Sequence, residues 1–150
     1  MAITQAMCTS FKKELLTATH NFTNGQNSFK LALYAISGGG KSSTTATLGA
    51  TTTAFTTTGE VATSGSYTTG GSALTNVTPT ASVTVGFCDF ADLSYTTATI
   101  TARGCLIYNS SQSNKAVCAL DFGGNKSSSS GTFTIQFPTA ASSTAIIRIS

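Results

Sequence analysis

The chain has 150 residues, a length that fits one domain and allows a hydrophobic core to form without metals or disulfide bonds. Only 9% of the residues are charged, against roughly a quarter in an average globular protein, and the net charge of +3 comes from scattered basic residues. No basic stripe could follow a phosphate backbone, and no stretch approaches the roughly 18 apolar residues that span a bilayer, so we expect neither nucleic acid nor membrane as a partner.

Threonine and serine replace the missing charged residues. The chain contains 29 Thr and 20 Ser. Threonine is β-branched and suits a pleated, half-exposed surface, so this composition favours strands over helices. The N-terminal residues lack the basic segment and apolar run of a secretory signal, which predicts synthesis in the cytoplasm.

Residues 2 to about 19 contain the one helix that the sequence predicts. Ile3, Met7, Phe11 and Leu15 recur every four residues and form an apolar helical stripe. A lone amphipathic helix packs either on the open edge of a sheet or on a neighbouring subunit, and the sequence leaves both choices open. Asn24 and the following glycine then supply a turn.

A strand, SFKLALYAI, follows this turn, with Phe29, Leu31 and Leu33 on its inward face and Lys30 on the other. Further along the chain, residues 76–90 alternate through Val83 and read as a strand at the edge of a sheet, with a connection from residue 88 onward.

Residues 37 to about 74 form a Gly-, Ser- and Thr-rich tract with isolated apolar anchors at Leu48, Phe55, Val61 and Tyr67. Such a tract is either flexible or an extended arm that becomes ordered only against a partner subunit. The regular spacing of the anchors favours the second interpretation.

Residues 95–150 read as four consecutive strands separated by turns. Apolar and polar residues alternate in YTTATITARGCLIY, in KAVCALDF and in TFTIQF, and AIIRIS closes the chain. A period of two indicates half-buried strands. We therefore predict an all-β fold, an antiparallel β-sandwich of jelly-roll type with one N-terminal α-helix, in a single domain that comprises residues 1–150.

The segment SGGGKSS at residues 37–43 resembles half of a phosphate-binding loop. The complete motif requires a glycine where this chain has Ala35, and a helix after Lys41, where TTATLGATTT is a poor helix sequence. Asp89 and Asp92 are the closest acidic pair, and turn capping with solvation is the simplest role for them. His20 is the single histidine, and we expect it to pack at a helix end. These residues predict no catalytic site, cofactor site or metal site.

The four cysteines lie far apart and without a C-x-x-C pair. In a cytoplasmic product we expect buried thiols, although Cys105 and Cys118 lie on strands that we expect to be adjacent, where a disulfide bond is conceivable.

The spread of ionisable groups over the whole chain favours a structural role over an enzymatic one. Low charge also reduces repulsion between copies, so we expect a homo-oligomer.

The sequence also resembles a family of small virion proteins of tailed bacteriophages. The resemblance follows the order THNF, FKLALY, GEV with a later SYTTGG, FCDFAD, ITARGCLIYN, KAVCALDFG, FTIQFP and AIIRI, and covers nearly the whole chain. It implies a particle component without enzymatic activity. A compact β-domain of this size is similar to the cement or decoration proteins that cover joints between major capsid protein subunits, often as trimers or dimers.

We therefore expect a capsid cement or decoration protein on the outer surface of a virion, with the major capsid protein and further copies of itself as partners, and with a trimer favoured over a dimer. A tail or host-contacting component is the alternative, and a small nucleotide or glycan hydrolase that uses Lys41 or Asp89 is a further one. A carbohydrate-binding module fits less well because the chain has no Trp. The residues expected to form assembly contacts are Ile3, Met7, Phe11, Leu15, Phe55, Val61 and Tyr67.

Overall fold

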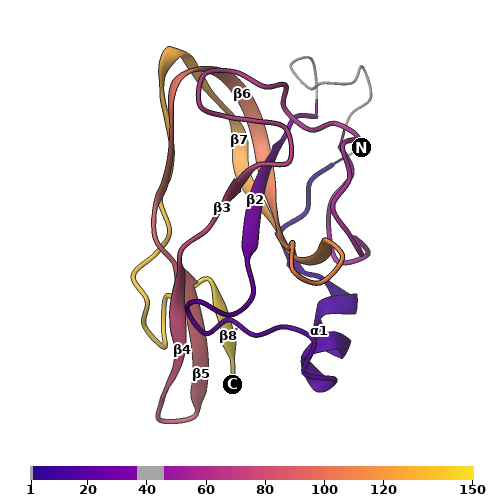
Figure 1. The fold of residues 1–150 in the computed structure, drawn as a ribbon, viewed down its shortest axis with the longest axis vertical. Helices are drawn as coiled ribbons and strands as arrows, with labels where there is room; N and C mark the ends of the chain where they lie inside the picture. The colour runs from indigo at the N-terminus through magenta and orange to yellow at the C-terminus, as the bar shows by residue number, and fades with distance from the viewer. Residues whose placement is uncertain (1, 37–45) are drawn as a thin grey trace.

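The computed structural model of the chain describes residues 2–36 and 46–150. Within these residues, one short helix and eight strands follow one another along the chain (Figure 1). In chain order they are β1 (Ala6–Met7), α1 (Thr9–Leu16), β2 (Phe29–Tyr34), β3 (Ser72–Ala73), β4 (Asn76–Ser82), β5 (Val85–Phe90), β6 (Leu93–Asn109), β7 (Lys115–Ile135) and β8 (Ile147–Ile149).

The strands form two antiparallel sheets. A five-stranded sheet has the order β1-β7-β6-β2-β3, and a three-stranded sheet has the order β4-β5-β8. Buried side chains from both sheets form one hydrophobic cluster. The predicted all-β fold with antiparallel sheets and one N-terminal helix is confirmed, and the two sheets agree with a sandwich-like arrangement. The jelly-roll connectivity stays a prediction.

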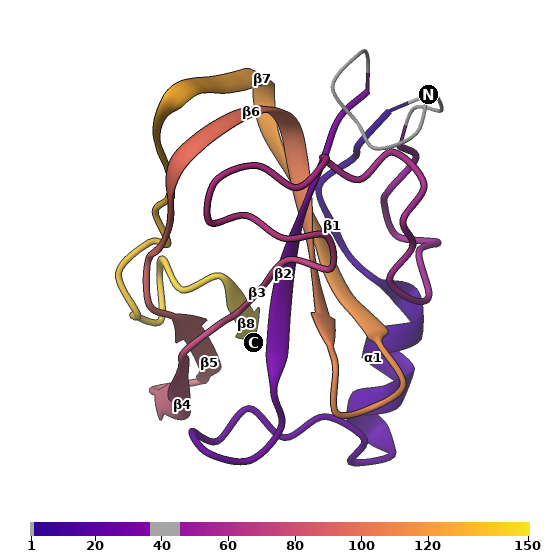
Figure 2. The same cartoon turned by 45° about the horizontal axis from the view of Figure 1, so that its top comes forward.

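The paired strands β6 and β7 are the longest elements, and they bend together. Between Ala102 and Gly104, β6 advances by two residues. Over the same stretch β7 advances by five, from Lys126 to Asp121. Because extra residues in one strand bend and twist a ladder, the two strands curve over together at one end of the molecule (Figures 1 and 2). This bend carries the start of β6 to the small sheet.

The predicted break between KAVCALDF and TFTIQF is wrong, because β7 runs from the first segment to Ile135 of the second. Residues 123–131 stay in the strand, where Ser127, Ser128 and Gly131 pair with β6. Hydroxyl pairs across the two strands support this pairing, since Thr101 and Ser127 lie 3.0 Å apart and Ser94 and Thr134 lie 2.9 Å apart.

Strand β2 lies in the middle of the core. Five of its six residues are buried, so its apolar run is nearly continuous. The Phe29 ring stacks on Phe22, with centroids 4.2 Å apart, and lies 6.0 Å from Phe90 of β5. The Tyr34 hydroxyl donates to the carbonyl of Thr56 at 2.6 Å. The strand is therefore covered both by the small sheet and by the segment that follows β2.

The predicted helix over residues 2–19 is confirmed only for Thr9–Leu16. Residues before it run extended: Ile3 forms a β-bridge with Leu48, and Met7 belongs to β1, which pairs with β7. The chain leaves the helix at Ala18, whose φ of +55° is incompatible with a right-handed helix. The four-residue spacing therefore reflects burial in strand and helix alike.

Residues 46–74 pack on the chain's own sheets, and the prediction of an arm that needs a partner to become ordered is wrong for them. Leu48, Val61 and Tyr67 are buried in the core, while Phe55 stacks on Tyr108 with centroids 4.7 Å apart. The same tract includes residues 37–45 with SGGGKSS, which lie outside the described residues. The described part, residues 46–74, contains no helix.

Residues 76–90 form a hairpin of β4 and β5 and not one strand. Val83 lies in the turn between Ser82 and Val85, which pair with each other. Residues 88–90, expected in a connection, complete β5. The valine alternation that predicted a continuous strand therefore runs through a turn.

Candidate functional site

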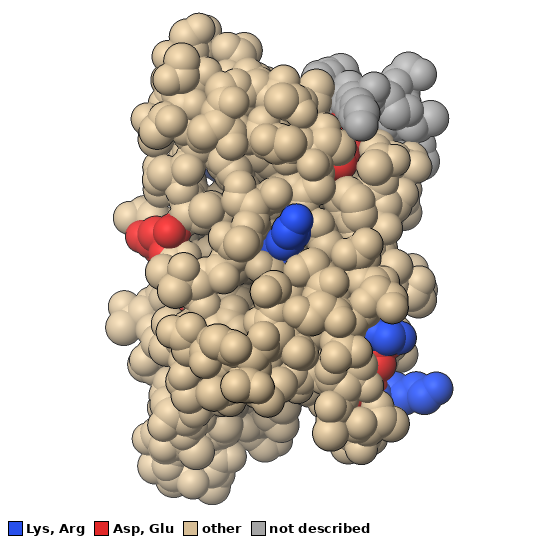
Figure 3. Space-filling model, in the orientation of Figure 1, with Lys and Arg blue, Asp and Glu red and all other residues tan. Residues whose placement is uncertain are grey.

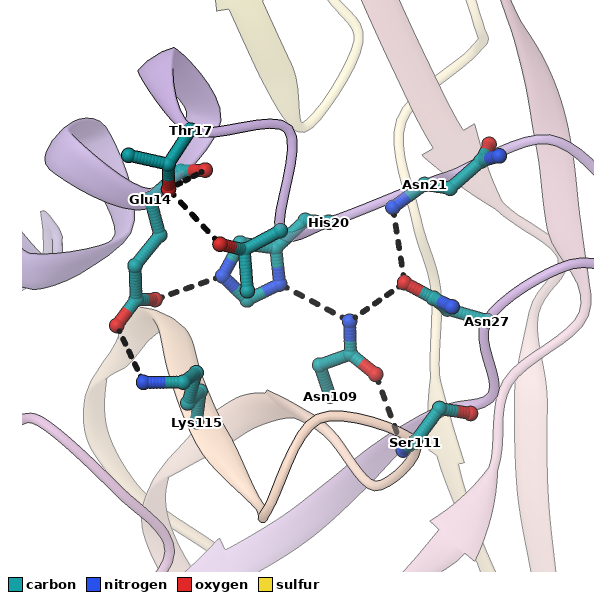
Figure 4. A network of polar contacts seen from close by, with 9 residues as sticks. Glu14, Thr17, His20, Asn21, Asn27, Asn109, Ser111 and Lys115 are labelled. Carbon is teal, nitrogen blue, oxygen red and sulfur yellow. Dashed lines mark hydrogen bonds and ion pairs between the residues drawn. The ribbon is translucent and has the colours of Figure 1, made fainter.

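Five polar residues from distant parts of the chain meet beneath α1, and we call them the His20 network: Glu14, His20, Asn27, Asn109 and Lys115 (Figure 4). Glu14 comes from α1, Asn109 ends β6 and Lys115 begins β7. His20 Nε2 lies 2.7 Å from Glu14 Oε2, and Lys115 Nζ lies 3.1 Å from Glu14 Oε1. Asn109 Nδ2 lies 3.0 Å from both His20 Nδ1 and Asn27 Oδ1. The network therefore joins the helix to the open ends of two strands.

The amide orientations determine which nitrogen of His20 carries the proton. The Ser111 N–H donates to Asn109 Oδ1 at 3.0 Å, so the Asn109 Nδ2 group faces the ring. An amide NH₂ can only donate, which makes His20 Nδ1 the acceptor. The ring proton is then on Nε2, where it is donated to Glu14. Both ring nitrogens are engaged, so neither is free to bind a metal or to act as a general base.

The Glu14 carboxylate is the electrostatic centre of the network. Burial acts to raise its pKa, but hydrogen bonds from His20 and Lys115 outweigh burial, so the pKa lies below its ordinary value. The ring of His20 also packs against Phe11, with centroids 5.0 Å apart. The predicted role of His20 in packing at the helix end is confirmed.

Asp89 and Asp92 bind backbone groups around the chain's last segment. Asp92 Oδ1 accepts the N–H of Phe137 at 2.8 Å, and Asp89 Oδ1 accepts that of Phe90 at 2.9 Å. Burial raises the pKa of Asp89, although hydrogen bonds from the backbone of Phe90 and Ile146 oppose this rise. The predicted turn capping is wrong, because Asp89 lies within β5 and Asp92 binds the distant Phe137. Asp89 is also only 1% exposed, so its predicted solvation is wrong.

Asp121 forms a two-point contact with Arg103 across β6 and β7. Arg103 Nε lies 2.7 Å from Oδ1 and Nη2 lies 3.2 Å from Oδ2, and Oδ1 also accepts the N–H of Gly123. The hydrogen bond from Arg103 lowers the pKa of Asp121. Arg103 of β6 is thus paired with an acid on the neighbouring strand β7.

Glu60 is fully buried and holds the segment between β2 and β3 in place. Its Oε1 accepts hydrogen bonds from the Tyr67 hydroxyl at 2.9 Å and from the N–H of Gly70. The Tyr67 oxygen in turn accepts the N–H of Leu33 at 3.0 Å. The chain has five acidic residues, and each of them, Glu60 included, accepts hydrogen bonds from other groups of the chain.

An apolar groove of about 540 Å³ lies beside the His20 network, between α1 and the small sheet. No Lys, Arg, Asp or Glu is among the residues that line it. Its walls come from α1, β5 and β8, through Phe11, Leu15, Phe87, Cys88, Ile147 and Ile149. On the face of the molecule drawn in Figure 3, few charged side chains are visible, and wide uncharged surface separates them.

The seven expected assembly contacts do not form one exposed surface. Four are buried in the chain's own core, and three are half-buried and pack against it. The prediction that the four buried side chains contact a partner is wrong in this structure, because burial leaves them no free surface. The buried residues are Ile3, Phe11, Val61 and Tyr67, and the half-buried ones are Met7, Leu15 and Phe55.

All four cysteines are buried free thiols, as the sequence predicts. Burial, assisted by nearby Glu14, raises the pKa of Cys8 to about 11, and burial next to Asp89 raises that of Cys88 to about 12. Cys105 and Cys118 do not face each other, since Cys105 pairs in register with Leu120. The conceivable disulfide between them is absent.

Sequence reasoning missed the roles of Asn27, Asn109 and Glu60. The asparagines sit in turn sequences where Asn is ordinary, and Glu60 lies in a threonine-rich tract without a pattern. Asn27 and Asn109 bind each other across 82 positions, and Glu60 binds residues in a segment without periodicity, so no local pattern could have identified them.

Comparison of the chain with known proteins found no matching family model, no significantly similar curated protein and no significantly similar solved structure. Within residues 2–36 and 46–150, no three His, Cys, Asp or Glu side chains gather in a way that could hold a metal ion. The only described helix, α1, has eight residues and is too short to cross a bilayer.

Proposed function

We propose that the chain is a structural virion protein, a cement or decoration protein on the outer surface of a phage capsid that bridges joints between major capsid protein subunits. It acts as a homo-oligomer, with three copies favoured, and it has no enzymatic activity. Its contribution is mechanical, because each contact of roughly 1,000 Å² or more adds interface that opposes outward pressure on the shell.

The hydrogen bonds of the five acids carry this proposal. Glu14, Glu60, Asp92 and Asp121 accept hydrogen bonds from groups elsewhere in the chain, and Asp89 accepts one from the backbone of Ile146. Enzymes instead gather titratable groups at an accessible cleft. A fold whose acids all serve as internal ties suits a protein that must stay rigid under load.

The surface composition supports the same proposal. The exposed parts of β6 and β7 are rich in Ser and Thr and poor in charge. Such a surface offers many hydrogen-bonding groups with little electrostatic repulsion between adjacent subunits. The resemblance of ITARGCLIYN and KAVCALDFG to small phage virion proteins gives the direction toward a particle, and these two segments are the central paired strands here.

A hydrolase gains no support from the described residues. Asp89, one of the two residues expected to carry hydrolysis, is almost fully buried and binds backbone N–H groups. The other, Lys41, lies outside the described residues.

Gold-labelled antibody against the purified protein tests the proposal on intact particles of the phage that encodes the chain. We expect label over the head. Label confined to the tail would replace the proposal with a tail or host-contacting component, and particles that contain none of the protein would refute a virion role.

A further inference from the structure

All four large hydrophobic side chains that are exposed among the described residues belong to the elements around the apolar groove, and Val77 of β4 is the least exposed of them, at 39%. Leu16 of α1 is 89% exposed, Val83 at the turn of the β4–β5 hairpin is 100% exposed, and Ile149 of β8 is 56% exposed. The helix, the hairpin turn and β8 lie at the same end of the molecule (Figure 1). We call this part, the groove with Leu16, Val83 and Ile149, the apolar end. Exposed apolar side chains that gather at one end of a molecule point to a contact site.

Val83 is the most unusual residue of the apolar end. Its φ of +56° lies in the left-handed region, where a β-branched side chain is rarely found. Gly, Asn or Asp would occupy this turn without that strain. Val83 is also completely exposed, so no contact within the chain explains why a valine stands there. Strain of this kind is retained where the residue has a use outside the local fold.

The exposed edge of the hairpin that carries Val83 is protected without charge. Six of the seven β4 residues are exposed, and residues 76–88 contain no charged side chain. Pro79 and a bulge between Val77 and Thr80 interrupt the pairing of β4, whereas soluble proteins commonly also place Lys on such edges. Because this hairpin has no charge to pair with a charged group, a surface that packs on it should be uncharged as well.

We propose that the turn of the β4–β5 hairpin, with Val83 foremost, seats in the apolar groove of a second copy of this chain. The groove is lined without Lys, Arg, Asp or Glu, so it complements an uncharged apolar hairpin. Each copy carries both the projection and the groove, so the contact is reciprocal in a two-fold dimer and closes a ring when it runs head to tail in a trimer.

The contact surface consists of the exposed side chains at the rim of the groove and at the hairpin turn, because Phe11, Phe22, Cys88 and Ile147 of the groove lining are buried within the chain. The inference deepens the proposed function and rests on it for the purpose of the oligomer, whereas the contact itself is testable on the purified protein.

Two substitutions test the contact from its two sides by sedimentation velocity over a concentration series. Val83→Asn removes the apolar projection while keeping a residue that tolerates positive φ. Gly86→Trp fills the groove, because a side chain added at Gly86 meets no atom within 4 Å. The matched controls are Val77→Asn, on the same hairpin and 39% exposed, and Gly124→Trp, at another position with open space.

We expect the wild type to sediment at two or three times the 15.2 kDa of one chain, and each test substitution to weaken association at least tenfold. The controls should change it less than about twofold. A wild type that stays monomeric up to 1 mM overturns the inference, and so does an oligomer that neither test substitution weakens.

A crosslinking experiment keeps the inference testable if a substitution disturbs folding. Val83→Cys protein is mixed with Gly86→Cys protein under mild oxidation, and the native cysteines are buried in both. A disulfide-linked heterodimer supports the contact, and its absence from an oligomeric mixture contradicts it. A monomeric protein would contradict the contact between copies but not a virion role, which the antibody label tests. The inference and the proposed function can therefore be refuted independently.

Discussion

Replacing Tyr67 with Phe removes one oxygen from the centre of the segment between β2 and β3. That oxygen donates to Glu60 Oε1 at 2.9 Å and accepts the N–H of Leu33 at 3.0 Å. Tyr67 is fully buried, so water does not replace either contact. Burial, opposed by the Leu33 hydrogen bond and assisted by Glu60, raises the pKa of Tyr67 far above its ordinary value, which keeps the hydroxyl protonated as a donor.

The size of the effect follows from the partners that the substitution leaves behind. The buried N–H of Leu33 loses the oxygen that accepts its hydrogen bond, which costs about 1 to 3 kcal/mol. Glu60 Oε1 keeps the N–H of Gly70, so the second lost bond costs about 1 kcal/mol. We expect Tyr67→Phe to lower the free energy of unfolding by about 2 to 4 kcal/mol, a large share of the roughly 5 to 15 kcal/mol typical of a domain.

Urea unfolding monitored by circular dichroism measures this loss. Tyr108→Phe is the matched control, since the Tyr108 hydroxyl donates one bond, to the carbonyl of Gly70, and we expect a loss of about 1 kcal/mol. A Tyr67→Phe loss below about 0.5 kcal/mol, or one no larger than that of the control, would refute the role assigned to the Tyr67 hydroxyl.

Three further predictions concern charge, thiols and glycines. The pKa of Glu14 in the folded protein lies below its ordinary value of 4.5, so the stabilisation from Glu14 is present above pH 4.5 and is lost as pH falls through the folded pKa. Glu14→Gln should therefore reduce the change in the free energy of unfolding between pH 6 and pH 3, measured by urea unfolding. An unchanged pH dependence would contradict the network. With its pKa near 11, Cys8 is only roughly one part in a thousand thiolate at pH 8, so a thiol reagent should find no fast-reacting cysteine among the four until the chain unfolds, and one fast equivalent would contradict their burial. Gly71 and Gly123 have φ of +72° and +74°, but a Cβ at Gly71 would lie 1.9 Å from the Leu31 carbonyl oxygen, whereas one at Gly123 would meet nothing within 4 Å. In urea unfolding, Gly71→Ala should therefore lower the free energy of unfolding by more than about 3 kcal/mol and Gly123→Ala by about 1 to 2 kcal/mol. Equal losses would exclude the close approach at Gly71.

Alternation of apolar and polar residues predicted strands well where one face of the strand is buried. It predicted them poorly where hydrogen bonds between strands, and not burial, hold the strand. Thr- and Ile-rich β6 shows alternation because its outer half has one buried face, at Ala98 and Ile100. Residues 123–131 of β7 carry no such signal, since hydroxyl and backbone pairing with β6 hold them in the strand. The pattern of Ile3 and Phe11 was real, but it recorded burial in a strand bridge and in a helix, which a four-residue spacing does not separate.

The polar centres could not be predicted from the sequence for a different reason. Glu14 meets Lys115 across 101 positions, and Asn109 meets His20 across 89. Such contacts depend on topology, which no local pattern records. The apolar end was likewise hidden, because Val83 fits a strand alternation and only the turn exposes it.

A cryo-EM reconstruction of the intact virion tests the central proposal most directly. We expect density for this chain on the outer capsid surface, over joints between major capsid protein subunits, with neighbouring copies meeting through the apolar end. Density for the chain on the tail, or none anywhere in the particle, would contradict it.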